Sequence, residues 1–286
     1  LGFQLLEHEW YIDRETEIIK KVAGDLARVG ADVGFGPCPN IDGDIKKLRF
    51  SLTAGEIERY LFLGDKLSAA IEKIMLGICP GDKECEIAGR AGTLLWSDRI
   101  DPTAVMVAAD DRIYKYRHPI PTARMVRRYV MVCINARYKG LIATVTRLLH
   151  IGRPPGGLGK QFSDNNEIEC RMIAATKPGV TAAVPFAVGL AAYRDLGYPD
   201  EWQLHHQGGA MGYYARDSKV TAETQDPVAP NQAFCWNPSI TGTKTEDGFI
   251  ATDAGPLMIT KPVIYPRLTT VIDGLAIVKP GLLILD

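Results

Sequence analysis

The sequence contains no long hydrophobic run. Apolar stretches such as residues 281–285 are far shorter than the roughly 20 residues that a membrane-spanning helix requires. Residues 1–10 include acidic and histidine side chains and lack the basic-then-apolar pattern of a secretory signal. We therefore expect a protein that is not a membrane protein and is not secreted.

An excess of charge of one sign is also absent. The 33 Lys and Arg residues nearly balance the 34 Asp and Glu residues, for a net charge of −1. Nucleic acids and anionic membranes attract strongly basic proteins, so neither is expected as a partner. A small molecule or a short peptide is the expected ligand.

The six cysteines, at positions 38, 79, 85, 133, 170 and 235, include no C-x-x-C pair and are widely dispersed. This spacing does not indicate a disulfide framework, so we expect reduced thiols and a cytoplasmic location.

Nucleotide-binding motifs are missing as well. Residues 156–160 read Gly-Gly-Leu-Gly-Lys, but Pro154 and Gln161 depart from the phosphate-loop pattern, which favours a surface loop. Residues 208–212 lack the G-x-G-x-x-G order of a dinucleotide site.

The 286 residues, 46% of them hydrophobic and 23% charged, are enough for one large domain or two ordinary ones. Residues 14–29 are predicted to form a helix, followed by a Gly/Pro-rich connector at 30–43. Thr53 and Glu56 have capping-box spacing and predict a helix to Leu76. A Pro-Gly joint at 80–81 separates it from a helix ending at Leu95, and paired strands are predicted at 104–109 and 128–134.

The second half repeats this order. Helices are predicted at 166–176 and 181–196, separated by a Pro-Gly joint at 178–179 that lies 98 residues after the first. Strands follow, including a hairpin at 269–278 that turns at Asp273-Gly274. The pattern indicates an α+β fold with an internal duplication.

Three segments carry residues suited to chemistry. His118 lies between Arg117 and Pro119-Ile120-Pro121, where the prolines restrict the backbone; proton transfer and a loop-capping role fit it equally. His205, His206 and Gln207 precede two glycines and indicate a pocket, although paired histidines are more often structural than metal ligands. Residues 234–239 and 243–247 place polar groups among apolar ones, as in a hydrogen-bonded turn or around a carboxylate with a perturbed pKa.

Taken in order, these segments resemble the pita-bread family, which includes methionine aminopeptidase, X-Pro aminopeptidase, prolidase and creatinase. The resemblance covers about residues 51–260 and depends on the Pro-Gly joints at 80–81 and 178–179, His118-x-x-Pro121, 138–140 with Thr146-Arg147, His206-x-x-Gly209, Asn237-Pro238 and Glu246-Asp247. It implies two pseudo-symmetric α+β halves around a central pocket. Residues 1–50 would be the end of an N-terminal domain with its linker, 51–260 the catalytic-type domain, and 261–286 a C-terminal hairpin extension.

Metallopeptidases of this family hold two metal ions with two Asp, one His and two Glu. The resemblance places these five ligands at Cys133, Thr144, His206, Asn237 and Glu246, so three carboxylates are missing. Two divalent ions need several anionic oxygens, so a dinuclear site is not expected and no cofactor is predicted. A single zinc on Cys133, His206 and Glu246 is the alternative. A further family histidine corresponds to Tyr213.

Creatinase shows that this fold can hydrolyse a C–N bond without metal, and His118 matches its proton-transferring histidine. We therefore expect His118 and Glu246 to be catalytic, with Glu246 orienting water or a cationic part of the substrate. The expected substrate-binding residues are Arg147, which would bind a carboxylate, with His205, His206, Gln207, Tyr213 and Asn237. The alternatives are a metal-dependent X-Pro aminopeptidase or dipeptidase and a non-catalytic binding protein. The family commonly forms dimers, so a homodimer is expected.

Overall fold

The computed structural model describes residue 2 and residues 4–286. The chain separates into two units, residues 1–49 and residues 50–286. The first unit contains helix α1 (Glu15–Ala23), a 3₁₀ turn η1 (Leu26–Arg28) and helix α2 (Asp42–Leu48). The single helix predicted for 14–29 is therefore wrong in its second part. Gly24 ends α1 with a φ of 77°, a conformation that glycine adopts without strain and that most residues avoid.

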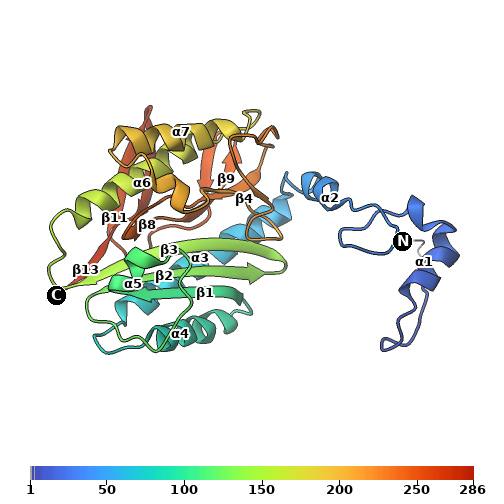
Figure 1. Ribbon diagram of the computed structural model, residues 1–286, viewed down its shortest axis with the longest axis horizontal. Helices are drawn as coiled ribbons and strands as arrows, with labels where there is room; N and C mark the ends of the chain where they lie inside the picture. The colour runs from blue at the N-terminus through green and yellow to red at the C-terminus, as the bar shows by residue number, and fades with distance from the viewer. Residues whose placement is uncertain (1, 3) are drawn as a thin grey trace. The chain divides into compact units, whose positions relative to one another are not determined.

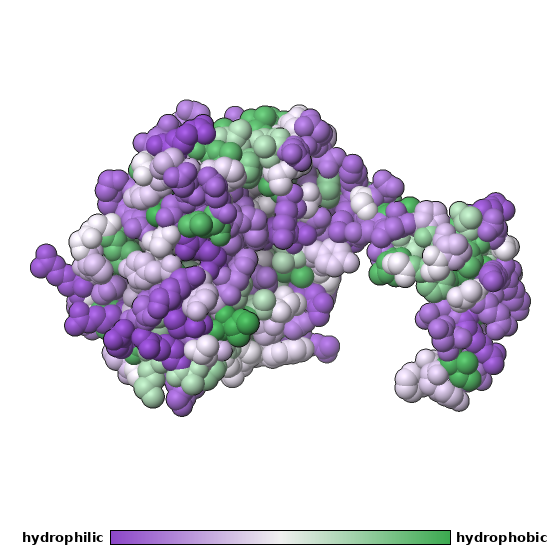
Figure 2. Space-filling model, in the orientation of Figure 1, coloured by the Kyte–Doolittle hydropathy of each residue, from purple (hydrophilic) through white to green (hydrophobic). Residues whose placement is uncertain are grey.

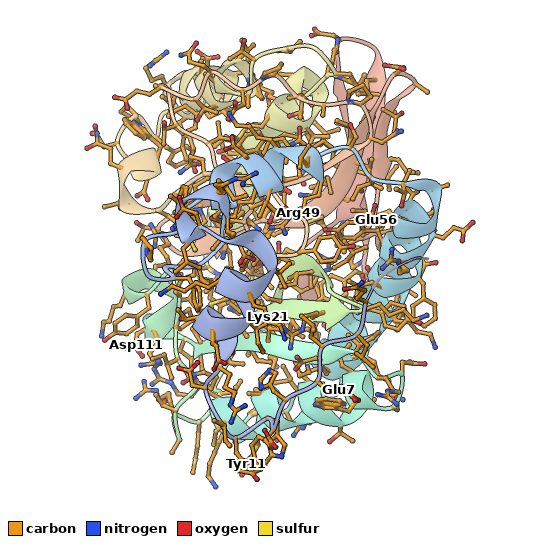
Figure 3. All side chains as sticks on the ribbon, turned by 90° about the vertical axis from the view of Figure 1, so that its right-hand side faces the viewer. Glu7, Tyr11, Lys21, Arg49, Glu56 and Asp111 are labelled. Carbon is orange, nitrogen blue, oxygen red and sulfur yellow. The ribbon has the colours of Figure 1, made fainter. Side chains whose placement is uncertain are left out.

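The second unit begins with the predicted capping box. The Thr53 side chain accepts a hydrogen bond from the Glu56 backbone, and the Glu56 side chain accepts one from Thr53. This starts helix α3 (Ala54–Leu76), on which Figure 3 labels Glu56. After the Pro-Gly joint comes helix α4 (Glu84–Trp96), followed by strand β1 (Asp101–Ala109), the short helix α5 (Asp111–Lys115), and strands β2 (Tyr129–Tyr138) and β3 (Leu141–Ile151). β1 and β2 pair antiparallel, which confirms the predicted strands.

The second half repeats the plan, as the sequence indicates. Helices α6 (Leu158–Ala175) and α7 (Ala183–Asp195) precede a second sheet with the order β10-β9-β6-β4-β5. Its strands are β4 (Gly208–Ala210), β5 (Ser218–Lys219), β6 (Gln232–Trp236), β9 (Asp247–Thr252) and β10 (Gly255–Met258), with a separate small ladder of β7 (Ser239–Ile240) and β8 (Thr243–Lys244). The surface loop predicted at 156–160 is correct for 156–157 and wrong for 158–160, because α6 begins at Leu158 behind Gly157, which has a φ of 90°.

The C-terminal residues belong to the second unit. The predicted hairpin is present as β11 (Arg267–Ile272) and β12 (Leu275–Pro280), joined at Asp273-Gly274. Strand β13 (Leu283–Leu285) then pairs parallel with β3, completing the first sheet in the order β1-β2-β3-β13. Residues 261–286, which were expected to form a C-terminal extension, therefore belong to the second unit, and their last strand completes the first sheet.

The helices of the second unit lie outside its strands. Figure 1 shows α6 and α7 on one side, α4 on the other, and the strands of both halves between them. One apolar core packs α3 and α4 against the first sheet, and another packs α6 and α7 against the second. The face of this unit visible in Figure 2 is mostly hydrophilic, with scattered hydrophobic residues. Among the described residues, no helix combines the length and apolar character needed to cross a membrane.

Candidate functional site

The two halves meet where strand β3 approaches the segment before β9. Thr146 of β3 and Glu246 form an isolated antiparallel bridge, in which the Thr146 backbone N–H donates to the Glu246 carbonyl at 3.0 Å. The Glu246 side chain is buried at this junction. Residues of both halves therefore converge here.

Both carboxylate oxygens of Glu246 are bound by protein groups. Arg216 Nη2 donates to Oε1 at 2.9 Å, and Lys244 Nζ lies 3.2 Å from Oε2. Thr146 Oγ1 also donates to Oε2 at 2.8 Å. The expectation that Glu246 orients water or binds a cationic substrate group needs correction, since the protein's own cations already occupy this carboxylate.

Burial and neighbouring charges determine which side chains at this junction are ionised. Although burial raises the pKa of Glu246, Lys244 and Arg216 hold that pKa well below its ordinary value, so the carboxylate is ionised. Burial raises the pKa of Cys133, and it raises the pKa of Cys235 to about 12, so both thiols are neutral at pH 7. Two cations therefore face one anion, and the cluster of Glu246, Arg216 and Lys244 carries an excess of positive charge.

The positions that correspond to the two lost aspartates face the same cations. Arg216 Nη1 donates to Thr144 Oγ1 at 3.1 Å, and Thr144 Oγ1 lies 3.0 Å from Cys235 Sγ. Lys244 Nζ lies 3.9 Å from Cys133 Sγ. A guanidinium and an ammonium thus occupy the surroundings of three of the five positions where the family resemblance implies metal ligands.

The residues present do not fit a pair of divalent ions. Such a pair needs several anionic oxygens, whereas Glu246 is the one carboxylate among these five positions and is already bound by Arg216 and Lys244. The alternative of a single zinc on Cys133, His206 and Glu246 would require the ammonium of Lys244 to leave the space beside Cys133 and Glu246.

Three histidines form a second group. His118 Nε2 and His205 Nε2 are 2.9 Å apart, and the ring centroids of His205 and His206 are 4.4 Å apart in a stacked arrangement. His205 follows the 3₁₀ turn η2 (Glu201–Leu204), and His206 precedes β4. The structure therefore brings together the three histidines that the sequence singled out in two separate segments.

The loop that carries His118 is tied to the segment that carries His205. Arg117 Nη2 donates to Glu201 Oε2 at 2.9 Å and to Thr241 Oγ1 at the same distance. Arg117 Nε donates to Ser239 Oγ at 3.0 Å. Because Arg117 adjoins His118 and Glu201 begins η2, this network holds the two imidazoles next to each other.

All three imidazoles are neutral at pH 7. Burial, followed by the charge of Lys244, lowers the pKa of His205 to about 2. Burial and Arg216 lower the pKa of His206 to about 4, and burial and Lys244 lower the pKa of His118. A neutral imidazole can accept a proton, so His118, the exposed member of the group, can act as a base.

The other predicted substrate-binding residues bond within the protein. Arg147 is buried and donates to Asp247 Oδ1 at 3.0 Å, so its carboxylate partner is internal and the expected role in substrate binding needs correction. Gln207 donates to the carbonyl oxygens of Trp202 and His205. Tyr213 donates to Glu56 Oε1 at 2.7 Å.

Asn237 lies at the edge of the site. It is buried, its backbone N–H donates to the Gln207 carbonyl, and its Oδ1 has no hydrogen-bond partner among the described residues. An unpaired buried oxygen is costly unless a ligand or water satisfies it. Of the residues expected to bind substrate through polar atoms, Asn237 and the histidines retain capacity for a ligand.

Sequence reasoning missed Arg216 and Lys244. Lys244 lies two residues before Glu246, which is the spacing that directs side chains of an extended segment to the same side. That spacing is a signal that could have indicated the ion pair. Nothing near Arg216 in the sequence indicates its position, because it reaches Glu246 from a loop 30 residues away.

No family model matches the chain, but comparison with curated proteins finds Xaa-Pro dipeptidases among its relatives. The chain is 24% identical over 234 residues to an Xaa-Pro dipeptidase of Pyrococcus furiosus, covering 77% of this chain and 66% of that protein. Here the chain spans slightly less than two thirds of the relative's length.

Solved structures show the same fold at low identity. The X-Pro aminopeptidase of Thermotoga maritima matches with a TM-score of 0.77 and 19% identity, covering 96% of this chain and 79% of that one. The N-terminal domain of the FACT complex subunit SPT16 from Cicer arietinum matches with a TM-score of 0.70 and 12% identity, covering 90% and 74%. The chain has the pita-bread fold that the sequence resemblance implied, and its curated and structural neighbours include prolidase and aminopeptidase P family proteins.

Proposed function

From the pita-bread fold and the cation-filled junction, we propose that this protein is a peptidase-like hydrolase that cleaves a C–N bond in a short peptide or small amide without a dinuclear metal centre. The observation that carries the metal-free part of the proposal is the binding of Glu246 by Arg216 and Lys244. These two side chains supply the positive charge for which the metallopeptidases of the family use metal ions. The Xaa-Pro dipeptidase relatives support the hydrolase part of the proposal.

The proposed reaction uses His118 to move one proton. Its neutral imidazole accepts a proton from a water molecule as the water oxygen attacks the carbonyl carbon, and the same proton then passes to the departing nitrogen. The C–O bond forms, the C–N bond breaks, and His118 returns to its neutral state. The excess positive charge of Arg216 and Lys244 favours the negative charge that develops on the carbonyl oxygen.

His205 positions His118 in this scheme. With 2.9 Å between their Nε2 atoms, one imidazole donates and the other accepts, which fixes the orientation of the His118 ring. A cytoplasmic location and a homodimer remain predictions.

Replacing His118 tests the proton-transfer role. We expect His118→Ala to lower kcat by about 100-fold or more, because general acid–base catalysis contributes about 10²–10⁴-fold to a rate. The measurement is release of free amine from a panel of X-Pro dipeptides and small amides. His8→Ala, which removes an exposed histidine of the first unit, is the matched control. Unchanged turnover in the His118 variant would reject the role.

The metal content of the purified protein tests the other half of the proposal. We expect turnover to persist after dialysis against a chelator. Two bound metal ions per chain, with activity lost to chelator and restored by metal, would instead establish a metal-dependent X-Pro peptidase.

A non-catalytic binding protein is the second candidate. The saturated carboxylate of Glu246 favours it, since no acidic group among the five family metal positions is left to act on a substrate. The similarity in fold to the N-terminal domain of a FACT complex subunit supports this candidate. Peptides that raise the unfolding temperature but are never cleaved would support this candidate over the hydrolase.

A further inference from the structure

The three imidazoles of His118, His205 and His206 can do more than transfer protons. We infer that together they form a binding site for one Zn²⁺ ion, separate from the dinuclear site implied by the family resemblance and sharing only His206 with it. Among the residues that the structure describes, they are the one group of three or more His, Cys, Asp or Glu side chains whose ligand atoms all lie close together, within 4.8 Å of one another.

The geometry needs little adjustment to hold an ion. Zinc–nitrogen bonds of about 2.0–2.1 Å in a tetrahedral site place the ligand nitrogens about 3.3 Å apart. The Nε2 atoms of His118 and His205 are already 2.9 Å apart, and the ring centroids of His118 and His206 are 5.7 Å apart. One ligand atom from each of the three side chains lies within 4.8 Å of the other two, so rotation of the rings, including that of the exposed His118, can bring all three nitrogens onto one ion.

One candidate ligand nitrogen has no partner among the described residues. Nδ1 of His206 is buried and unpaired there, whereas the unpaired Nδ1 of His205 lies across its ring from the Nε2 that would bind the ion. A buried, unpaired imidazole nitrogen is costly. An ion bound at Nδ1 of His206 would give that buried nitrogen a partner.

The ligand type selects the ion. Neutral imidazole nitrogens suit Zn²⁺, whereas Mg²⁺ and Ca²⁺ prefer oxygen ligands. Three histidines leave the fourth tetrahedral position of zinc open for water. Arg216, Lys244 and Lys219 contribute positive charge near the cluster and Glu246 contributes the opposing negative charge. The net repulsion makes binding weaker than at a site with anionic ligands, but it does not change the selectivity for zinc over magnesium.

Zinc binding has a consequence for catalysis, and this part depends on the proposed function. An ion that ligates His118 removes the lone pair that accepts the proton of water. Zinc would therefore inhibit hydrolysis, and a chelator would relieve the inhibition. This response is the opposite of that of a metal-activated peptidase.

Equilibrium dialysis of the full chain against ZnCl₂ tests the site without any substrate. We expect about one ion per chain, no displacement by excess MgCl₂, and a higher unfolding temperature with ZnCl₂. His118→Gln and His205→Gln should each weaken binding about tenfold or more, since the loss of even an outer partner of a metal ligand costs about 10–100-fold in affinity. His8→Gln, which alters a histidine outside the cluster, should bind zinc like the wild type.

Unfolding of each variant without zinc shows whether it is folded. If His205→Gln is not folded, zinc binding by His118→Gln tests the site alone, because the exposed His118 side chain can be replaced without opening the core. Zinc binding that both variants retain, or that MgCl₂ abolishes, overturns the inference. Since binding is measured without turnover, the site can fail while the hydrolase proposal stands, and the reverse also holds.

Discussion

Glu246→Gln is expected to destabilise the protein by about 3–5 kcal/mol, because it leaves the buried cations of Arg216 and Lys244 facing each other without an anion. The substituted amide keeps the size of the side chain and its capacity to accept a hydrogen bond from Thr146, so lost packing does not explain the effect. Chemical denaturation of the wild type and the variant measures the difference in the free energy of unfolding.

Two further variants separate charge from bulk. Lys244→Met removes one cation but leaves the Glu246–Arg216 pair balanced, so we expect a loss of less than about 1.5 kcal/mol, as in a volume-conserving core substitution. Glu167→Gln breaks the partly exposed pair with Arg171 and should cost about 0–1 kcal/mol. Equal losses for Glu246→Gln and Lys244→Met would contradict the assignment of excess positive charge to this junction.

Because of Glu246, we expect the free energy of unfolding to fall in acid. Its pKa in the folded protein lies well below the ordinary value of 4.5, as a result of Lys244 and Arg216 acting against burial. The unfolded chain therefore binds a proton that the folded protein does not as pH falls below about 4.5, so the contribution of Glu246 is present above that pH and is lost below it. The difference in stability between wild type and Glu246→Gln should shrink as pH falls from 5 towards about 3. A difference that does not vary with pH would show that Glu246 is not the group responsible.

Much of the fold was predictable because it follows from local signals. The capping box at Thr53 and Glu56, the Pro-Gly joints and the Asp273-Gly274 turn each act within a few residues, and the structure contains the helix and hairpin that they predict. The start of α6 was missed because helix propensity and tertiary packing disagree there. Glycines at 156, 157 and 159 have low helix propensity, yet Leu158 and Phe162 are buried against β2 and β3, and that packing outweighs propensity.

The site was predictable only in part. The histidines were identified because each lies in a distinctive segment, whereas the assignment of the family's metal positions by the order of landmarks stays a prediction. The role of Glu246 was not accessible, since it depends on Arg216, which comes from a loop of the second sheet. Arg147 was misread for a similar reason: its partner Asp247 lies 100 residues further along the chain. Pairings over such distances follow from tertiary structure and leave no periodic trace in the sequence.

Lys279→Met is expected to destabilise the protein by about 3–5 kcal/mol, the other large effect that the structure predicts. Lys279 of β12 is buried, binds Glu169 of α6 and lies 3.3 Å from Asp247 Oδ2. Asp247 in turn accepts from Arg147 of β3, so one chain of buried charges joins the C-terminal hairpin to both halves. Without the ammonium, Glu169 and Asp247 would remain close together with too little opposing charge. Lys160→Met, which removes an exposed lysine paired with Asp164, should change the free energy of unfolding by about 0–1 kcal/mol. If Lys279→Met also cost only about 0–1 kcal/mol, the hairpin would be held by its backbone pairing and apolar contacts rather than by this ion pair.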